Sequence, residues 1–367
     1  MMARLEEICA INMGQSPDSS TYNEDGNGLP FFQGNADFGE IYPAVRMWCS
    51  EPTKIAREKD ILISVRAPIG ALNIANCECC IGRGLAALTV NEDICAQEYL
   101  WHALSGKVDE LNSKGTGSTF KAINKKTLSE TEIPLPPIDE QRKIAAILDK
   151  VSDLIAKRRQ QLDKLDAMVK ARFVEMFGDP QNNEKNWKMR TFKEICTVRQ
   201  GLQIPISKRL THFEENCYEY ITVAYLHGAK DKEYIKNPKS TVICTKDDVL
   251  MTRTGNSGMV ITNVAGVFHN NFFLIDFDRD KYIKEFLVEY LNLDLIQTEL
   301  KKRAGTSTIP DLNHSEFYKI AIYEPPMDLQ NQFAAFVNQT EKSKTTISRS
   351  LEKLETLKKA LMQEYFR

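Results

Sequence analysis

Apolar side chains recur with a coiled-coil spacing over a long stretch in the middle of this chain. The steps between them alternate between four and three residues, and the series runs Ile144, Leu148, Val151, Ile155, Arg158, Leu162, Leu165, Val169, Arg172 and Met176. This alternation is typical of a helix that packs along one seam. No Gly or Pro interrupts the series before Gly178-Asp179-Pro180, which predicts the end of the helix. At 1.5 Å per residue, about 39 residues give a helix roughly 58 Å long.

A second series with the same spacing lies near the end of the chain. It runs Phe333, Val337, Thr340, Lys344, Ile347, Leu351, Leu354, Lys358, Leu361 and Tyr365. Both series follow a Pro-Pro pair, and the two stretches correspond at a constant offset of 189 residues. The identical pairs at that offset include Pro136/Pro325, Pro137/Pro326, Asp139/Asp328, Gln141/Gln330, Ala145/Ala334, Leu162/Leu351, Glu175/Glu364 and Phe177/Phe366. Self-similarity at one fixed offset indicates a duplication, here of a globular segment followed by a long helix.

One helix cannot bury such a seam alone, so we expect the two long helices to pair. A globular segment separates them along the chain, which favours an antiparallel pair and an approximate two-fold relation between the copies. The seam also contains four cationic residues, Arg158, Arg172, Lys344 and Lys358. They could fix the register of the pair or contact a partner, and the sequence leaves both possibilities open.

The segments before the two helices contain short β-branched and aromatic runs broken by Gly, Pro and Asn, such as Leu29–Phe32, Asp60–Val65 and Leu85–Val90. These runs predict strands, and the apolar spacing over Ala96–Leu111 predicts a helix. The fold class is therefore α+β, with two similar mixed α/β domains that have strand-rich cores. We place them at 1–137 and 181–326, with the long helices at 138–180 and 327–367. The framework is repeated while the loops diverge, as expected of two domains that recognise different targets.

Composition narrows the possible functions. Lys and Arg number 48 against 50 Asp and Glu, which is not the strongly basic balance of a stand-alone nucleic-acid binder. No apolar stretch is long enough to span a membrane, and Met1–Glu7 lacks the apolar core of a signal peptide, so we predict a cytoplasmic protein. Nine scattered cysteines suit a reducing compartment. The cluster Cys77-Glu78-Cys79-Cys80 has no second ligand pair, and we interpret these cysteines as core residues.

The sequence contains no recognisable catalytic motif. The loop Gly115–Lys121 is rich in glycine but does not match a phosphate-binding loop. Neither Pro-Pro pair has the flanking residues of an amino-methyltransferase motif. The five histidines have no nucleophile or carboxylate pattern around them. We therefore predict a protein that is not an enzyme on its own.

Side chains that can contact DNA are more numerous. Asn, Gln and Arg can bind base edges, while Lys, Ser and Thr can bind phosphates. Asn124 and Asn313 occupy matched positions and could equally be helix caps, and Lys302 and Arg303 could merely end a helix. The candidates are Gln33, Asn35, Arg66, Arg83, Lys114, Ser118, Thr119, Lys121 and Asn124 in the first domain, and Gln203, Arg209, Arg253, Asn256, His269, Asn270, Asn271, Lys302, Arg303, Thr306, Ser307 and Asn313 in the second.

The chain resembles the specificity subunit of type I restriction-modification systems. The resemblance spans the chain and is carried by Ile133–Ala145, by Phe177-Gly178-Asp179-Pro180 with the following Asn183 and Trp187, and by Asp60–Gly70 and Cys80–Leu88. It implies a non-catalytic subunit whose two target-recognition domains each read one half of a bipartite, asymmetric site in double-stranded DNA. The helical pair would set the spacing between the halves.

The resemblance also implies partners. Two methyltransferase subunits would dock on the helices and bind S-adenosylmethionine, and restriction subunits that use ATP and Mg²⁺ would join them, so this chain would hold no cofactor. The alternative is a coiled-coil scaffold whose globular ends bind other proteins. Two divergent sets of loops favour DNA recognition over the scaffold.

Overall fold

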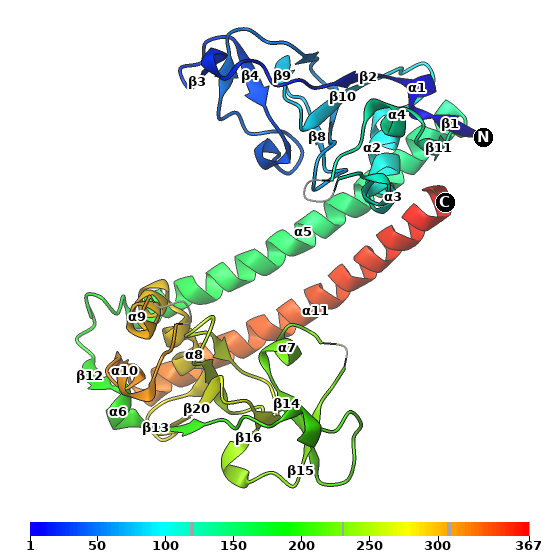
Figure 1. Cartoon of the computed structure of the whole chain (residues 1–367). Coiled ribbons are helices and arrows are strands. Elements are labelled where there is room, and N and C mark those ends of the chain that lie inside the picture. The colour runs from blue at the N-terminus through cyan, green and yellow to red at the C-terminus, as the bar shows by residue number, and fades with distance from the viewer. Residues whose placement is uncertain (118–120, 230, 307–309, 367) are drawn as a thin grey trace. The chain divides into compact units, whose positions relative to one another are not determined.

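The computed structural model describes residues 1–117, 121–229, 231–306 and 310–366 (Figure 1). Contacts divide the chain into two compact units. The first unit comprises Met1–Arg159 and Arg349–Arg367, and the second unit comprises Gln160–Ser348. Each unit contains strands and helices, which confirms the predicted α+β class. Both long helices, α5 (Ile138–Phe177) and α11 (Met327–Phe366), contribute to both units.

The first unit contains a short antiparallel pair and two larger sheets. One sheet has the order β2-β10-β7-β8, and the other has the order β3-β5-β4-β9-β6, in which β4 and β9 run parallel. The strands are β1 (Met2–Arg4), β2 (Cys9–Met13), β3 (Tyr22–Asn23), β4 (Leu29–Phe32), β5 (Trp48–Cys49), β6 (Ile55–Ala56), β7 (Ile61–Ser64), β8 (Leu72–Ile74), β9 (Cys79–Ile81), β10 (Leu85–Val90) and β11 (Glu132–Pro134).

The helices of the first unit before α5 are α1 (Leu5–Ile8), α2 (Gln97–Ser105), α3 (Val108–Lys114) and α4 (Lys125–Ser129). The single helix predicted over 96–111 is therefore wrong in one respect. Gly106 interrupts it, since the Gly106 N–H bonds back to the carbonyls of His102 and Ala103 and glycine disfavours helix interiors.

The second unit repeats this plan. Its sheets have the orders β13-β20-β17-β18 and β15-β14-β19-β16, and β14 and β19 run parallel. The strands are β12 (Lys188–Thr191), β13 (Cys196–Gln200), β14 (Cys217–Ile221), β15 (Tyr234–Lys236), β16 (Ile243–Cys244), β17 (Val249–Thr252), β18 (Val260–Ile261), β19 (Gly266–Phe268), β20 (Phe272–Phe277) and β21 (Ala321–Glu324). The helices are α6 (Phe192–Ile195), α7 (Val223–Leu226), α8 (Lys284–Asn292), α9 (Asp294–Ala304) and α10 (His314–Phe317).

The long helices pack against each other within each unit. In the first unit the end of α11 meets the domain core, where Phe366 contacts the Tyr99 ring at a centroid distance of 5.2 Å, and Arg159 of α5 pairs with Glu355 of α11 at 2.7 Å. In the second unit Lys344 of α11 pairs with Asp166 of α5 at 2.8 Å. Higher numbers on one helix meet lower numbers on the other, so the helices are antiparallel within each unit, as predicted.

The seam prediction fails at the end of α5. It assigned Arg172 to the seam, but Phe173 is the fully buried residue there, and it contacts Phe333 of α11. Arg172 instead pairs with Glu175 on its own helix at 2.8 Å. The reason is the aromatic core of the second unit, which draws Phe173 and Phe177 inward.

The cysteines behave as core residues. Eight of the nine are buried and Cys77 is partly exposed. Burial raises the pKa of the Cys9, Cys79, Cys95 and Cys196 thiols to about 12, which makes them poor nucleophiles and poor metal ligands. None of the described helices is both long enough and apolar enough to cross a membrane.

Candidate DNA-reading hollows

A hollow of about 390 Å³ opens in the first unit beyond the parallel strands β4 and β9. Three backbone hydrogen bonds bring its walls together. The Gly82 N–H donates to Phe32 O at 2.8 Å, the Gly84 N–H to Gln33 O at 3.2 Å, and the Val65 N–H to Gly84 O at 2.9 Å. The turn Gly82–Gly84 therefore joins Gln33 on one side to Val65 and Arg66 on the other. We call this the first hollow.

The second unit has a hollow of about 490 Å³ at the corresponding place, beyond the parallel strands β14 and β19. The His269 N–H donates to Ile221 O at 3.0 Å, and the Arg253 N–H donates to Asn271 O. These bonds match those of the first hollow, so the turn His269–Asn271 corresponds to Gly82–Gly84. We call this the second hollow. The duplication has thus preserved two cavities in equivalent positions while their linings have diverged.

Arginines and amides line the first hollow. Four of the predicted DNA-binding residues, Gln33, Asn35, Arg66 and Arg83, face it, together with Asp37 and Arg46, which sequence reasoning missed. The Arg46 guanidinium donates to Ala36 O at 2.6 Å. The Arg66 and Arg83 side chains are exposed and form no hydrogen bond or ion pair with any residue that the structure describes. Two free guanidinium groups therefore face this cavity.

The glycines of the turn let it approach so closely. A Cβ on Gly84 would lie 2.5 Å from Gln33 O, whereas a Cβ on Gly34 would meet nothing within 4 Å. We predict that Gly84→Ala lowers the free energy of unfolding by about 1–3 kcal/mol, since backbone must move to relieve the clash. Gly34→Ala, in the same hollow, is the matched control and should change stability by less than about 0.5 kcal/mol. Urea denaturation of both variants measures this, and equal stabilities would contradict the packing argument.

Cations in the second hollow are neutralised by neighbours. Arg209 pairs with Glu233 at 2.9 Å, donates to Ile204 O, and lies over the Tyr220 ring at 5.0 Å. Lys232 forms a short ion pair with Glu219, which lowers the pKa of that carboxyl. Burial, with Arg209 nearby, lowers the pKa of His269, so its imidazole is neutral at pH 7. The second hollow therefore has no unpaired cation among its described lining residues, although the exposed Asp231 carboxylate also lines it.

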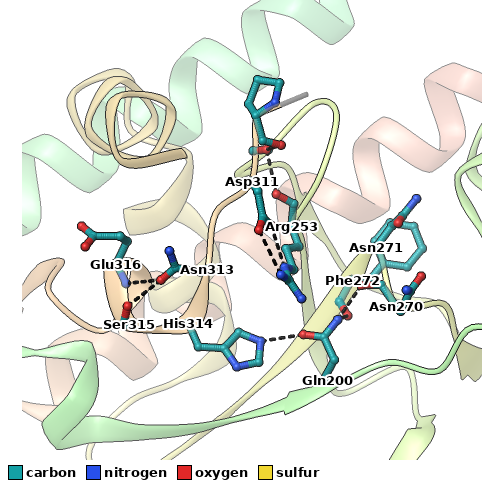
Figure 2. A network of polar contacts seen from close by, with 12 residues as sticks. Gln200, Arg253, Asn270, Asn271, Phe272, Asp311, Asn313, His314, Ser315 and Glu316 are labelled. Atoms are coloured by element: carbon teal, nitrogen blue, oxygen red, sulfur yellow. Dashed lines mark hydrogen bonds and ion pairs between the residues drawn. The ribbon is translucent and has the colours of Figure 1, made fainter. Parts of the chain in front are cut away.

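A polar network braces the wall of the second hollow (Figure 2). Arg253 forms a bidentate pair with Asp311, with Nε–Oδ1 at 2.6 Å and Nη2–Oδ2 at 2.9 Å. Gln200 donates to the carbonyls of Asn270 and Phe272, and its Oε1 lies 2.7 Å from His314 Nε2. The network fixes the turn at 269–271 against the segment at 311–314.

Among the described residues, the first unit has no counterpart of the Arg253–Asp311 pair. Backbone pairing matches Arg253 with Val65 and Asp311 with Ala122, since Leu312 N donates to Arg253 O as Ile123 N does to Val65 O. An apolar pair in one copy is thus an ion pair in the other. The Arg253 side chain is used internally, and it is a positioning residue for the hollow.

Comparison with known proteins assigns the chain to a family. Residues 1–166 and 184–358 match the family described as "Type I restriction modification DNA specificity domain". The chain belongs to this family. The two matched ranges include the first and second hollows, so each hollow lies in one copy of a DNA specificity domain.

Relatives of known name agree with this assignment. The putative type I restriction enzyme MjaX specificity subunit of Methanocaldococcus jannaschii is 44% identical over 161 residues, which cover 44% of this chain and 38% of that protein. The MjaIX specificity subunit of the same organism is 30% identical over 45% of this chain and 42% of its own length. The chain therefore matches less than half the length of these specificity subunits. They are named as specificity subunits and not as scaffold proteins.

Solved structures show the same fold over the whole chain. The type I restriction-modification S subunit from M. genitalium aligns with 100% of this chain and 96% of its own, with a TM-score of 0.65 and 15% sequence identity. A second solved chain, described under complex assembly and conformational transition of the type I R-M system, aligns with 100% of this chain and 97% of its own, with a TM-score of 0.58 at 17% identity. At these identities the likeness concerns the fold.

Several other predicted site residues cap helices or form ion pairs within the chain. Asn124 and Asn313 cap α4 and α10 through their side chains, which confirms the alternative of a helix cap. Arg303 in the last turn of α9 pairs with Glu299 at 2.6 Å and with Glu316 at 3.3 Å. Lys114 pairs with Glu110 at 2.7 Å. Their contact with DNA stays a prediction.

The other predicted residues lie at the second hollow, on the exposed surface or outside the described residues. Asn271 and His269 line the second hollow, and Asn270 lies in the same turn, where its Nδ2 donates to Gln203 at 3.3 Å. Lys121, Asn256, Lys302 and Thr306 are exposed. Ser118, Thr119 and Ser307 lie outside the described residues. The lining residues Thr222 and Lys232 were missed, because the pairing of β14 with β19 and with β15 brings them to the cavity.

Proposed function

We propose that this chain is the DNA-recognition subunit of a type I restriction-modification complex in the cytoplasm. Each unit reads one half of a bipartite, asymmetric site in double-stranded DNA through its hollow. The observation that supports this proposal is the pair of matched hollows: a duplicated scaffold holds two cavities with equivalent walls and different linings. One scaffold with two different reading surfaces suits an asymmetric target.

The helices α5 and α11 set the spacing between the two half-sites and bind partner subunits. An exposed apolar series, Ile147, Leu154 and Met168, recurs on α5 at multiples of seven residues, so it follows one side of the helix. Leu357 of α11 is exposed too and matches Met168 at the repeat offset. Exposed apolar side chains along a helix suit a protein partner, and we assign them to two methyltransferase subunits.

Catalysis and cofactors belong to these partners in this proposal. Methyltransferase subunits bind S-adenosylmethionine and modify an adenine that is flipped out of the helix. Restriction subunits use ATP and Mg²⁺. This chain contributes sequence recognition, and its nearly balanced charge of 48 cationic against 50 anionic residues leaves much of the phosphate affinity to the partner subunits.

Methylome sequencing of cells with and without the gene tests the proposal, with the methyltransferase gene present in both. We expect one bipartite adenine-methylation motif that disappears when this chain is deleted. An unchanged methylome would count against DNA recognition and in favour of a scaffold.

A second arm tests the helices. Seven residues inserted into both α5 and α11 at matched levels lengthen each helix by about 10.5 Å, or roughly 3 base pairs of DNA. The spacer of the motif should grow by about that number while both half-sites keep their sequences. Altered half-sites with the original spacer would contradict the role given to the helices.

A further inference from the structure

The first hollow combines free cationic donors with a carboxylate oxygen that is also free. The side chains of Arg66 and Arg83 are exposed and form no hydrogen bond or ion pair within the described part of the chain. Their positions are fixed from the backbone, because the Gly82–Gly84 turn is bonded both to Gln33 and to Val65. The two guanidinium groups therefore extend from neighbouring, hydrogen-bonded segments of the cavity wall. A ligand in this cavity meets two cationic, planar donors.

Asp37 supplies the carboxylate. Its Oδ2 accepts from the N–H groups of Gln33, at 2.8 Å, and Gly34, at 3.4 Å, which holds the carboxylate against the wall of the cavity. Its second oxygen, Oδ1, accepts no hydrogen bond from a described residue. A carboxylate beside the arginines disfavours a phosphate group, since two anions would repel each other. It favours a ligand that offers both acceptors and a donor.

The major-groove edge of a G·C base pair offers that combination. Guanine presents N7 and O6 as acceptors, and cytosine presents its N4 amino group as a donor. Arginine binds the guanine edge in the commonest specific protein–DNA contact, and Asp can accept from cytosine N4. In an A·T pair, adenine offers one acceptor and an amino donor, and thymine offers O4 and a methyl group. A bidentate arginine therefore finds no second acceptor on the purine.

We propose that the first hollow reads a G·C base pair in the first half-site. Arg66 or Arg83 donates to guanine O6 and N7, and Asp37 Oδ1 accepts from cytosine N4. The inference rests on the proposed function and gives it a base identity. The second hollow lacks this combination, because Glu233 and Glu219 neutralise its Arg209 and Lys232. The assignment therefore applies to one half-site only.

The experiment uses the complex of the full chain with its methyltransferase subunits, and measures binding to a randomised duplex library as well as the methylome. The variants are Arg66→Ala, Arg83→Ala and Asp37→Asn. Arg57→Ala, an exposed arginine of the same unit outside the hollow, is the control. Melting temperatures of all variants verify folding.

We expect one arginine variant to lose about 5- to 150-fold in discrimination for G·C at one position of the first half-site, the equivalent of about 1–3 kcal/mol. Asp37→Asn should reduce the preference at the same position, because an amide donor then faces cytosine N4. The second half-site and the spacer should stay unchanged, and Arg57→Ala should bind like the parent chain.

Three outcomes overturn the inference while leaving the proposed function intact. One is a first half-site without a G·C pair. Another is an equal loss of affinity for all sequences with a shallower salt dependence, which would identify phosphate contacts. The third is unchanged specificity in all three variants. A parent complex that binds no bipartite site would refute the proposed function itself.

Discussion

Replacing Phe173 by alanine is expected to lower the free energy of unfolding of the second unit by about 3–5 kcal/mol, the usual cost of truncating a buried phenylalanine. Phe173 is fully buried near the end of α5. Its ring contacts those of Phe177, Phe286 and Phe333 at centroid distances of 4.8, 5.4 and 5.4 Å. These rings come from α5, α8 and α11, so one truncation opens a cavity where three helices meet.

Val174 is the matched control, because it follows Phe173 in the same helix but is 45% exposed. Val174→Ala should change stability by less than about 0.5 kcal/mol. Urea denaturation followed by the fluorescence of Trp187, which packs against the same core, measures both variants. Similar urea midpoints for the two variants would show that the Phe173 ring contributes little to the stability of the second unit.

The larger features of the fold could be predicted from the sequence because each of them has a local signal. The long helices show an uninterrupted apolar spacing, and Pro-Pro pairs precede both. The duplication is visible as identities at one offset. Gly178-Asp179-Pro180 predicted the end of α5, which the structure places at Phe177. Such signals depend on neighbours in the chain and need no tertiary information.

Details set by tertiary packing could not be predicted in this way. Strict spacing pointed to Arg172, and only the aromatic cluster of α8 and α11 explains why Phe173 is buried instead. The hollows depend on hydrogen bonds between residues far apart, such as Gly84 with Gln33 and Arg253 with Asn271. These hydrogen bonds have no counterpart in the spacing of residues along the sequence.

The sequence also does not show which candidate arginines are paired with carboxylates. As residue types, Arg66, Arg209 and Arg253 were equivalent candidates. In the structure Arg209 and Arg253 are paired with carboxylates, while Arg66 has no such partner among the described residues. Their partners, Glu233 and Asp311, lie 24 and 58 residues away in the chain. Only the tertiary fold separates a free guanidinium from a neutralised one.

Exchanging Gln141 for glutamate should destabilise the first unit by about 3 kcal/mol or more at pH 7, although the two side chains have nearly the same shape. Gln141 is fully buried where α5 begins. Its Nε2 donates to Ile94 O at 3.1 Å and Pro136 O at 2.8 Å, and its Oε1 accepts from the Ala96 N–H at 2.9 Å. A carboxylate keeps the accepting oxygen but turns the second one, with its charge, toward two carbonyl oxygens.

The duplicated residue predicts the same effect in the second unit. Gln330 is fully buried at the start of α11, donates to Lys281 O at 2.8 Å and Pro325 O at 2.9 Å, and accepts from the Ile283 N–H at 2.9 Å. Gln330→Glu should therefore destabilise the second unit by a similar amount. Gln160→Glu, on the exposed surface of α5, is the control and should cost less than about 0.5 kcal/mol.

Acid should reverse much of this loss. Burial among carbonyl oxygens raises the pKa of the introduced carboxyl above its unfolded value of about 4.3. The folded state then binds the proton more tightly, so the stability of the variant relative to the parent rises as the pH falls from the folded pKa toward about 4.3. A protonated carboxyl can also donate to one of the two carbonyls. Urea denaturation of parent and variants at pH 5 and pH 7 measures the difference. A deficit that is equal at both pH values would show that the carboxylate escapes to solvent, and that the glutamine does not lock the start of the helix to its domain.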